Sequence, residues 1–151
     1  MLFRSASGRS ADAIPILKQG LQKPPYDPNL VVSLAWALVD SGSDITEARH
    51  WLKIALQNDP HSPYLADTAA WMEYRGGNYQ AALTALQPSL THANEVPEIA
   101  YHAGAIHAKL GNLAQAAEFL KLSLQSPRPF NGQKEAKQLL QSLNAKREKP
   151  R

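Results

Sequence analysis

Small and aliphatic residues recur along this chain at an almost constant interval. Three series keep one register, with successive spacings of 35, 34 and 34 residues: Ala13, Ala48, Ala82 and Ala116; Leu17, Leu52, Leu86 and Leu120; and Leu21, Leu56, Leu90 and Leu124. A second register lies between them, at Leu34-Ala35-Trp36, Ala69-Ala70-Trp71 and Ala103-Gly104-Ala105. A period near 34 residues that carries two helical patterns predicts stacked helix–turn–helix repeats.

The repeat register predicts two helices in each repeat. First helices are expected near Asn29–Asp40, Ser62–Gly76 and Pro97–Leu110, and second helices near Ile45–Asn58, Tyr79–Leu90 and Leu113–Gln125. Asp27-Pro28 and Ser62-Pro63 suit helix starts, because an N-cap side chain accepts a backbone N–H and Pro loses nothing at the first helical position. Gly77 and Gly111 suit the left-handed residue that follows a helix end.

Small residues recur at fixed places within the expected helices. They are Ala35, Ala70 and Gly104 on first helices, and Gly20, Ala55, Ser89 and Ser123 on second helices. Small side chains allow neighbouring helix axes to approach closely, and Leu at the flanking positions then fills the groove between them. Pro88 falls inside an expected second helix, so this helix should bend or end there.

The patterns near the two ends of the chain predict a partial repeat at the first end and a capping helix at the other. Residues 8 to 25 have the pattern of a turn and a second helix, so the chain is either the C-terminal piece of a longer array or begins with a half repeat. Ala136, Leu139, Leu140 and Leu143 have helical spacing within Gln133–Leu143, which predicts a capping helix. The expected organisation is a partial repeat over 1–27, three repeats over 28–126, a loop and capping helix over 127–145, and a basic tail over 146–151.

The residues at the turns and second helices resemble the tetratricopeptide repeat signature. The matching residues are Gly77, Tyr79, Ala82, Leu86 and Ser89, and again Gly111, Leu113, Ala116, Leu120 and Ser123. This resemblance implies an all-α fold, a right-handed superhelical solenoid of antiparallel helix pairs with a C-terminal capping helix. Pro127-Arg128-Pro129-Phe130 followed by a short helix also resembles the C-terminal end of bacterial multi-repeat proteins of exopolysaccharide export and PEP-CTERM sorting systems.

Charge and composition narrow the classes of partner and location. The 151 residues carry a formal net charge of +3, and the segment after residue 145 alone accounts for it, so no basic face for nucleic acid is expected. The chain has no 18-residue apolar run, which disfavours membrane insertion. Its first residues lack the apolar stretch of a secretory signal, so a cytoplasmic location is the default, and a periplasmic one applies if the chain is a fragment of an exported protein.

The sequence offers no arrangement typical of catalysis or of metal binding. Cysteine is absent, and only His102 and His107 share an expected helix, at a separation of five residues rather than the four that metal-ligating pairs prefer. No Gly-x-Ser-x-Gly elbow, Ser-x-x-Lys element or Gly-rich phosphate loop is present. We therefore expect no enzymatic activity, no cofactor and no metal.

The resemblance assigns the concave face of the solenoid to the first helices. The partner-binding residues expected there are Trp36, Asp40, Tyr64, Asp67, Trp71, Tyr74, Arg75, Tyr101, His102 and Lys109. Aromatic residues are frequent binding hot spots, although Trp36 and Trp71 share a register and could equally fill space between repeats. The expected ligand is an extended or helical peptide of a protein partner. The alternative is a structural scaffold segment that docks onto upstream repeats or self-associates through its N-terminal half repeat.

Overall fold

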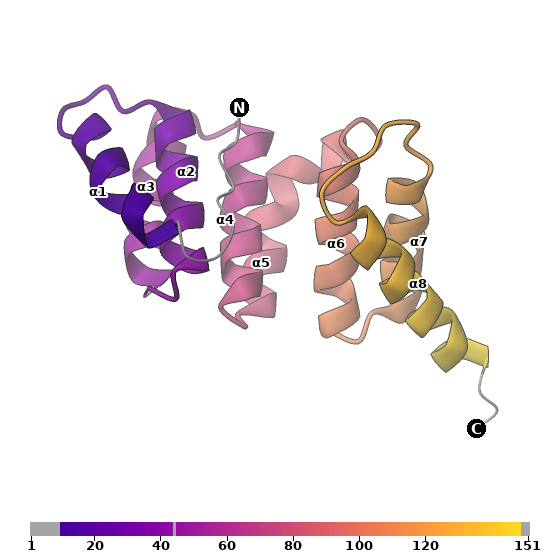
Figure 1. Ribbon diagram of the computed structural model, residues 1–151. Coiled ribbons are helices and arrows are strands. Elements are labelled where there is room, and N and C mark those ends of the chain that lie inside the picture. The colour runs from indigo at the N-terminus through magenta and orange to yellow at the C-terminus, as the bar shows by residue number, and fades with distance from the viewer. Residues whose placement is uncertain (1–9, 44, 149–151) are drawn as a thin grey trace.

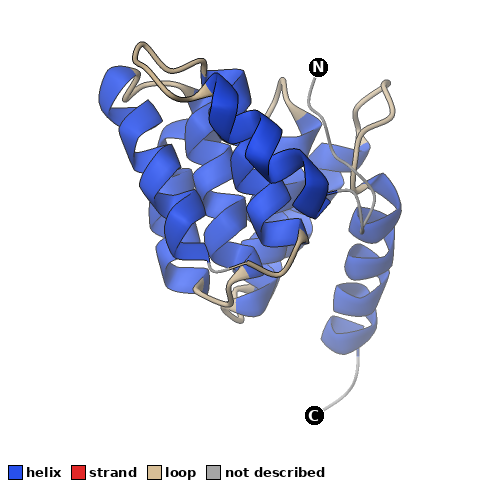
Figure 2. Ribbon diagram, turned by 60° about the vertical axis from the view of Figure 1, so that its left-hand side comes forward, coloured by secondary structure: helices blue, strands red, loops and turns tan. Residues whose placement is uncertain are grey.

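The computed structural model describes residues 10–43 and 45–148, and every regular element in these ranges is helical (Figures 1 and 2). The elements are α1 (Ser10–Gly20), α2 (Pro28–Asp40), α3 (Ile45–Asn58), α4 (Pro63–Arg75), α5 (Tyr79–Leu86), the 3₁₀ helix η1 (Gln87–His92), α6 (Pro97–Lys109), α7 (Leu113–Leu124) and α8 (Gln133–Glu148). The predicted turn at Gly8 lies outside the described residues.

The helices pack in adjacent pairs, as the repeat period predicts. Helix α2 packs against α3, α4 against α5 and η1, and α6 against α7, while α1 covers α2 at one end of the stack. The first helices are also neighbours, because α4 contacts both α2 and α6. At the other end α8 crosses obliquely and contacts α7 and α6 (Figure 1). The fold is therefore an all-α solenoid of helix pairs.

The expected start and stop signals act as predicted. The Asp27 carboxylate accepts a hydrogen bond from the backbone N–H of Asn29 at 2.8 Å, and the Ser62 hydroxyl accepts one from that of Leu65 at 3.2 Å. Gly77 and Gly111 follow helix ends with φ of 82° and 81°, a left-handed conformation that favours glycine. These residues fix bounds of α2, α4 and α6.

The second helix of the second repeat, expected over Tyr79–Leu90, is not one continuous α-helix. Helix α5 ends at Leu86, and the chain continues as the 3₁₀ helix η1, with Pro88 near its start. Proline has no N–H to donate to a carbonyl of the preceding turn, which explains the predicted change at this point. The Ser89 hydroxyl then donates to the Pro63 carbonyl at 2.6 Å, which ties η1 to the start of α4.

Helix α8 is longer than the hydrophobic pattern predicts. It continues to Glu148, so Lys146 and Arg147 belong to its last turn, and residues 149–151 lie outside the described residues. Cations near a helix C-terminus interact favourably with the helix dipole, which accounts for helical structure beyond the last apolar position, Leu143.

Most of the small residues on the helices are buried where helices meet, whereas Gly20, at the end of α1, is exposed. Ala35, Ala70, Ser89 and Ser123 are fully buried. Gly104 is the tightest case, because a Cβ atom placed there would lie 2.7 Å from Leu120 Cγ and 3.2 Å from the Ala116 carbonyl oxygen. Close contact between α6 and α7 thus depends on the missing side chain at position 104.

Substitution Gly104→Ala should therefore lower the free energy of unfolding by about 1–3 kcal/mol, because Leu120 is itself fully buried and cannot move away freely. Gly20→Ala is the matched control: its Cβ would meet only the flexible end of Leu30, and alanine favours helix, so stability should hold or rise. Urea unfolding followed by circular dichroism measures both variants. Equal stability of Gly104→Ala and the wild type would contradict this account of the α6–α7 contact.

Candidate partner-binding groove

Four of the residues expected to bind a partner line one pocket on the first helices. Trp36 comes from α2, Tyr64 and Asp67 from α4, and His102 from α6, and together they border a cavity of about 340 Å³. We call it the groove pocket. Its remaining lining residues are Pro63, Thr68, Val96, Glu98, Ile99, Arg128 and Asn131. The stacking of first helices thus brings together side chains about 35 positions apart in the sequence.

A buried hydrogen bond joins two of these residues across neighbouring repeats. His102 Nδ1 lies 2.7 Å from Asp67 Oδ1, and both side chains are largely buried. An ionised carboxylate only accepts hydrogen bonds, so the imidazole Nδ1–H is the donor. This bond links α4 to α6 inside the wall of the groove pocket and fixes the orientation of the imidazole ring.

Trp71 lies beside this pair and is held by aromatic stacking. Its ring is nearly parallel to that of Tyr74, with centroids 4.3 Å apart, and to the imidazole of His102, with centroids 4.0 Å apart. The side chain is only 7% exposed. Trp71 therefore packs between repeats and, through its remaining surface, lines a smaller pocket of about 190 Å³ with Arg75, Tyr101 and His102.

The segment before α8 lies across the face of α6 and completes both pockets. Asn131 lines the groove pocket and the smaller one, and the Arg128 guanidinium forms two hydrogen bonds with the Glu98 carboxylate, at 3.1 and 3.3 Å. Gly132 approaches the ring of Tyr101 so closely that a Cβ atom would clash with it, and it has a φ of 95°. The expected residue Tyr101 is thus partly covered by the chain's own C-terminal loop.

The other expected residues lie toward the C-terminal ends of the first helices. The Arg75 guanidinium is 3.4 Å from Asp40, a pair that links α2 and α4. Lys109 lies with its ammonium 5.8 Å from the centroid of the Tyr79 ring, and Tyr79 in turn contacts Tyr74. These residues form part of the same row of first helices but do not line the groove pocket.

Burial changes the acidity of two tyrosines on this face. Burial, with a contribution from the charge of Asp67, raises the pKa of Tyr64 to about 12. Burial also raises the pKa of Tyr74. Both phenols therefore stay protonated at neutral pH, and the Tyr64 hydroxyl is buried without a hydrogen-bond partner among the described residues.

Sequence reasoning missed the contribution of the C-terminal loop. Arg128 and Asn131 line the groove pocket, yet both lie in a stretch without hydrophobic periodicity. The sequence signal for a contact between this loop and the helices was Phe130, because an aromatic residue flanked by Pro, Asn and Gly needs an apolar surface to pack on. In the structure the centroid of its ring lies 6.4 Å from that of Tyr101.

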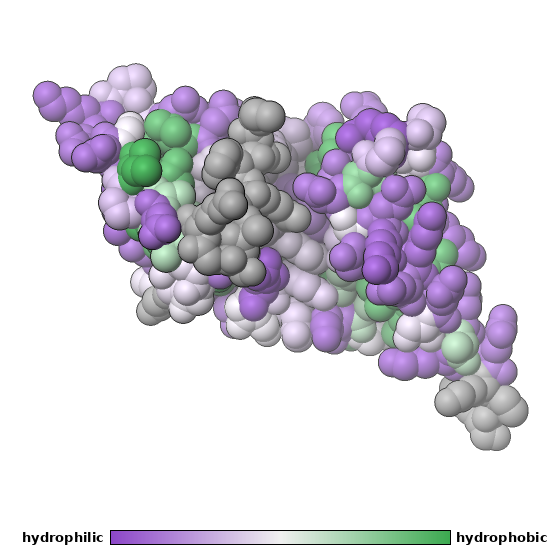
Figure 3. All heavy atoms as spheres, in the orientation of Figure 1, coloured by the Kyte–Doolittle hydropathy of each residue, from purple (hydrophilic) through white to green (hydrophobic). Residues whose placement is uncertain are grey.

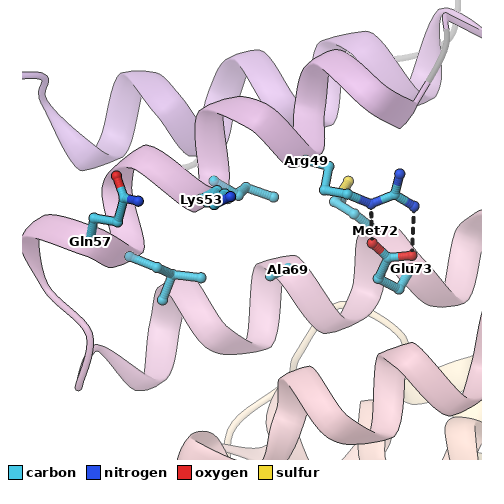
Figure 4. Close-up of a pocket in the computed structure, with 8 residues that line it drawn as sticks. Arg49, Lys53, Gln57, Ala69, Met72 and Glu73 are labelled. Atoms are coloured by element: carbon cyan, nitrogen blue, oxygen red, sulfur yellow. Dashed lines mark hydrogen bonds and ion pairs between the residues drawn. The ribbon is translucent and has the colours of Figure 1, made fainter.

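A second cavity lies between α3 and α4 on the other side of α4 (Figure 4). This back pocket has a volume of about 370 Å³, an apolar floor of Leu52, Leu56, Ala69 and Met72, and a rim of Arg49, Lys53, Gln57 and Glu73. At 100° per residue, Ala69 and Glu73 point away from Asp67 and Trp71. The two pockets therefore open on different faces of the solenoid.

The rim of the back pocket is held by an ion pair. The Arg49 guanidinium donates to both Glu73 oxygens, at 2.6 and 3.0 Å (Figure 4), and the Asn78 amide donates to one of them at 3.0 Å. The hydrogen bond from Arg49, with a smaller contribution from Asn78, lowers the pKa of the Glu73 carboxyl although burial opposes the change.

Nothing in residues 10–43 and 45–148 suggests a metal site, since no three His, Asp or Glu side chains gather in a group that could hold an ion. Within the same ranges every helix is too short or too polar to cross a bilayer.

Glu73 should make part of the stability dependent on pH. Its pKa is lower in the folded than in the unfolded chain, so its contribution is complete at neutral pH and is lost as the pH falls through the acidic range. Glu73→Gln should lower the free energy of unfolding by up to about 1 kcal/mol at pH 7, and the difference should shrink toward zero near pH 3. Urea unfolding at a series of pH values measures this. A difference that is constant with pH, or as large for the exposed control Glu118→Gln, would contradict it.

Comparison with protein families finds a match in the central part of the chain. Residues 68–131 match the family model described as tetratricopeptide repeat, a span from the middle of α4 to the loop before α8. A comparison with curated proteins finds no match. Tetratricopeptide repeats generally mediate protein–protein interactions and are typically non-catalytic. The family match over residues 68–131, the repeat period and the helix pairs agree, and this part of the chain is similar to tetratricopeptide repeats.

Proposed function

We propose that this protein is a non-catalytic interaction module that binds a peptide or helix of a protein partner in the groove formed by α2, α4 and α6. The observation that carries the proposal is the groove pocket, in which side chains from three successive first helices and the C-terminal loop converge. Trp36, Tyr64, Asp67 and His102 are the central residues, with Trp71, Tyr74, Arg75, Asp40, Tyr101 and Lys109 around them.

The size and lining of the pocket fit one anchoring side chain of a peptide. A volume of about 340 Å³ lies at the lower end of the range for ligand sites, which suits a side chain rather than a large cofactor. Aromatic and aliphatic walls with a few fixed polar groups are typical of peptide-binding hot spots. The buried Asp67–His102 bond and the stacking on Trp71 hold the walls in place before any ligand arrives, which reduces the ordering cost of binding.

The groove lacks the clamp with which some tetratricopeptide repeat proteins bind acidic chaperone tails. Their clamp uses Lys, Asn and Arg, and the corresponding positions here are Val32, Trp36, Thr68, Glu98 and His102. A partner of different chemistry is therefore expected.

The groove can be blocked without disturbing the core. Asn131 is exposed and borders both pockets of the concave face, so Asn131→Trp should fill the groove and abolish capture of the partner from a lysate of the source organism. Two matched controls carry the same new side chain elsewhere: Gln141→Trp on the exposed side of α8, and Gln57→Trp in the back pocket. Circular dichroism verifies the fold of each variant.

A protein retained by the wild type and Gln141→Trp, but not by Asn131→Trp, supports the groove as the binding site. Loss with Gln57→Trp alone would transfer the function to the back pocket. Equal recovery by all variants would contradict the proposal.

A second candidate function, a scaffold segment that associates through α1, has one observation in its favour. Ile16 is 70% exposed, and no other large hydrophobic side chain of the described residues is classed as exposed. It lies on α1 at the end of the stack, where Figure 3 shows a hydrophobic patch. This face could dock onto further repeats or onto a second copy of the chain.

Sedimentation equilibrium tests this second candidate. If α1 mediates self-association, the apparent mass of the wild type should rise with concentration toward that of a dimer, and Ile16→Asp should restore the monomer because it places a charge in the contact. A monomer at all concentrations would contradict self-association. Asn131→Trp serves as the control, since a substitution in the groove should leave this equilibrium unchanged.

A further inference from the structure

The groove pocket has an apolar wall and a polar end. Trp36, Val96 and Ile99 supply aromatic and aliphatic surface, while Asp67 and Thr68 on α4 are among the polar residues of the lining. An occupant that matches both parts needs an apolar stem and a polar head.

The acceptors of the polar end are only partly used. Asp67 Oδ1 accepts from His102, the second carboxylate oxygen has no hydrogen bond or ion pair among the described residues, and the side chain keeps 12% of its surface exposed. An ionised carboxylate can accept about four hydrogen bonds, so acceptor capacity remains.

The charges around the pocket favour a cationic head. Arg128 forms a two-bond pair with Glu98, so these two charges cancel each other. Asp67 remains, and its charge contributes to the raised pKa of the Tyr64 hydroxyl. His102 faces Asp67 with its Nδ1–H. A partner carboxylate would meet Asp67 and be repelled, and a purely apolar side chain would leave the remaining acceptor capacity of Asp67 unused.

We infer that the groove pocket takes a cationic side chain, arginine or lysine, of the partner peptide, with its alkyl stem against Trp36 and Ile99 and its donors on Asp67. Both side chains have a long apolar stem and several N–H donors on a charged head. This inference rests on the proposed function, since it names the residue type that the groove selects.

Retention of peptide pools by the immobilised full chain tests the inference without knowledge of the partner. Four pools of heptapeptides are randomised at all positions except the centre, which is fixed as arginine, citrulline, leucine or glutamate. Citrulline has the shape of arginine without its charge. The arginine pool should be retained about tenfold more strongly than the citrulline pool, as expected for hydrogen bonds to a charged group.

Variants test whether the preference for arginine over citrulline comes from the groove pocket. Asp67→Asn keeps an acceptor for His102 but removes the charge, so arginine and citrulline should then be retained equally. Asp40→Asn, the matched control, removes a groove carboxylate that does not line the pocket and should keep the preference. If Asp67→Asn does not fold, Asn131→Trp takes its place: it fills the groove pocket and should abolish the preference for arginine over citrulline.

The outcomes separate the inference from the proposed function. Equal retention of the arginine, citrulline and leucine pools, lost in Asn131→Trp, would overturn the cationic preference and keep the groove as a peptide site. Preferential retention of the glutamate pool would also overturn it. Retention of no pool would overturn both. An arginine preference that persists in Asp67→Asn would overturn the assignment to this pocket.

Discussion

Close approach between neighbouring helices is the constraint on which this solenoid depends. At positions such as Ala70 and Gly104 the side chain is small or absent, and the facing helix occupies the space, as Leu120 does over Gly104. A larger residue would push the helices apart and change the register between α4, α6 and α7. That register places Asp67 opposite His102 and Asp40 opposite Arg75, each pair 35 positions apart in the sequence.

Several kinds of contact act on the same side chains of the first helices. His102 donates a hydrogen bond to Asp67 and stacks on Trp71, whose ring also stacks on Tyr74. Each contact limits the rotamers of its partners, so the walls of the groove pocket are held in place. Trp36 and Trp71, which share a register, thereby serve different purposes: Trp36 borders the groove pocket, and Trp71 mainly holds neighbouring repeats together.

The repeat period predicted the helices well because each bound is set locally. Caps at Asp27 and Ser62 and left-handed glycines at 77 and 111 depend on residues within one turn, and Pro88 ends α5 for reasons that the sequence contains. The site was less predictable. The Asp67–His102 bond depends on how α4 and α6 rotate against each other, and the course of the loop with Arg128 and Asn131 depends on contacts with α6 that no periodic pattern encodes.

The three tryptophans allow one direct test of the central claim, that partners bind in the groove. Trp36 and Trp71 border the concave face, whereas Trp51 lies on α3 against Tyr26. Each indole N–H gives one cross-peak in a ¹H–¹⁵N correlation spectrum. On titration with the captured partner or an arginine-centred peptide, the account predicts shifts of the Trp36 and Trp71 cross-peaks with that of Trp51 unchanged. A shift of the Trp51 cross-peak alone would contradict it.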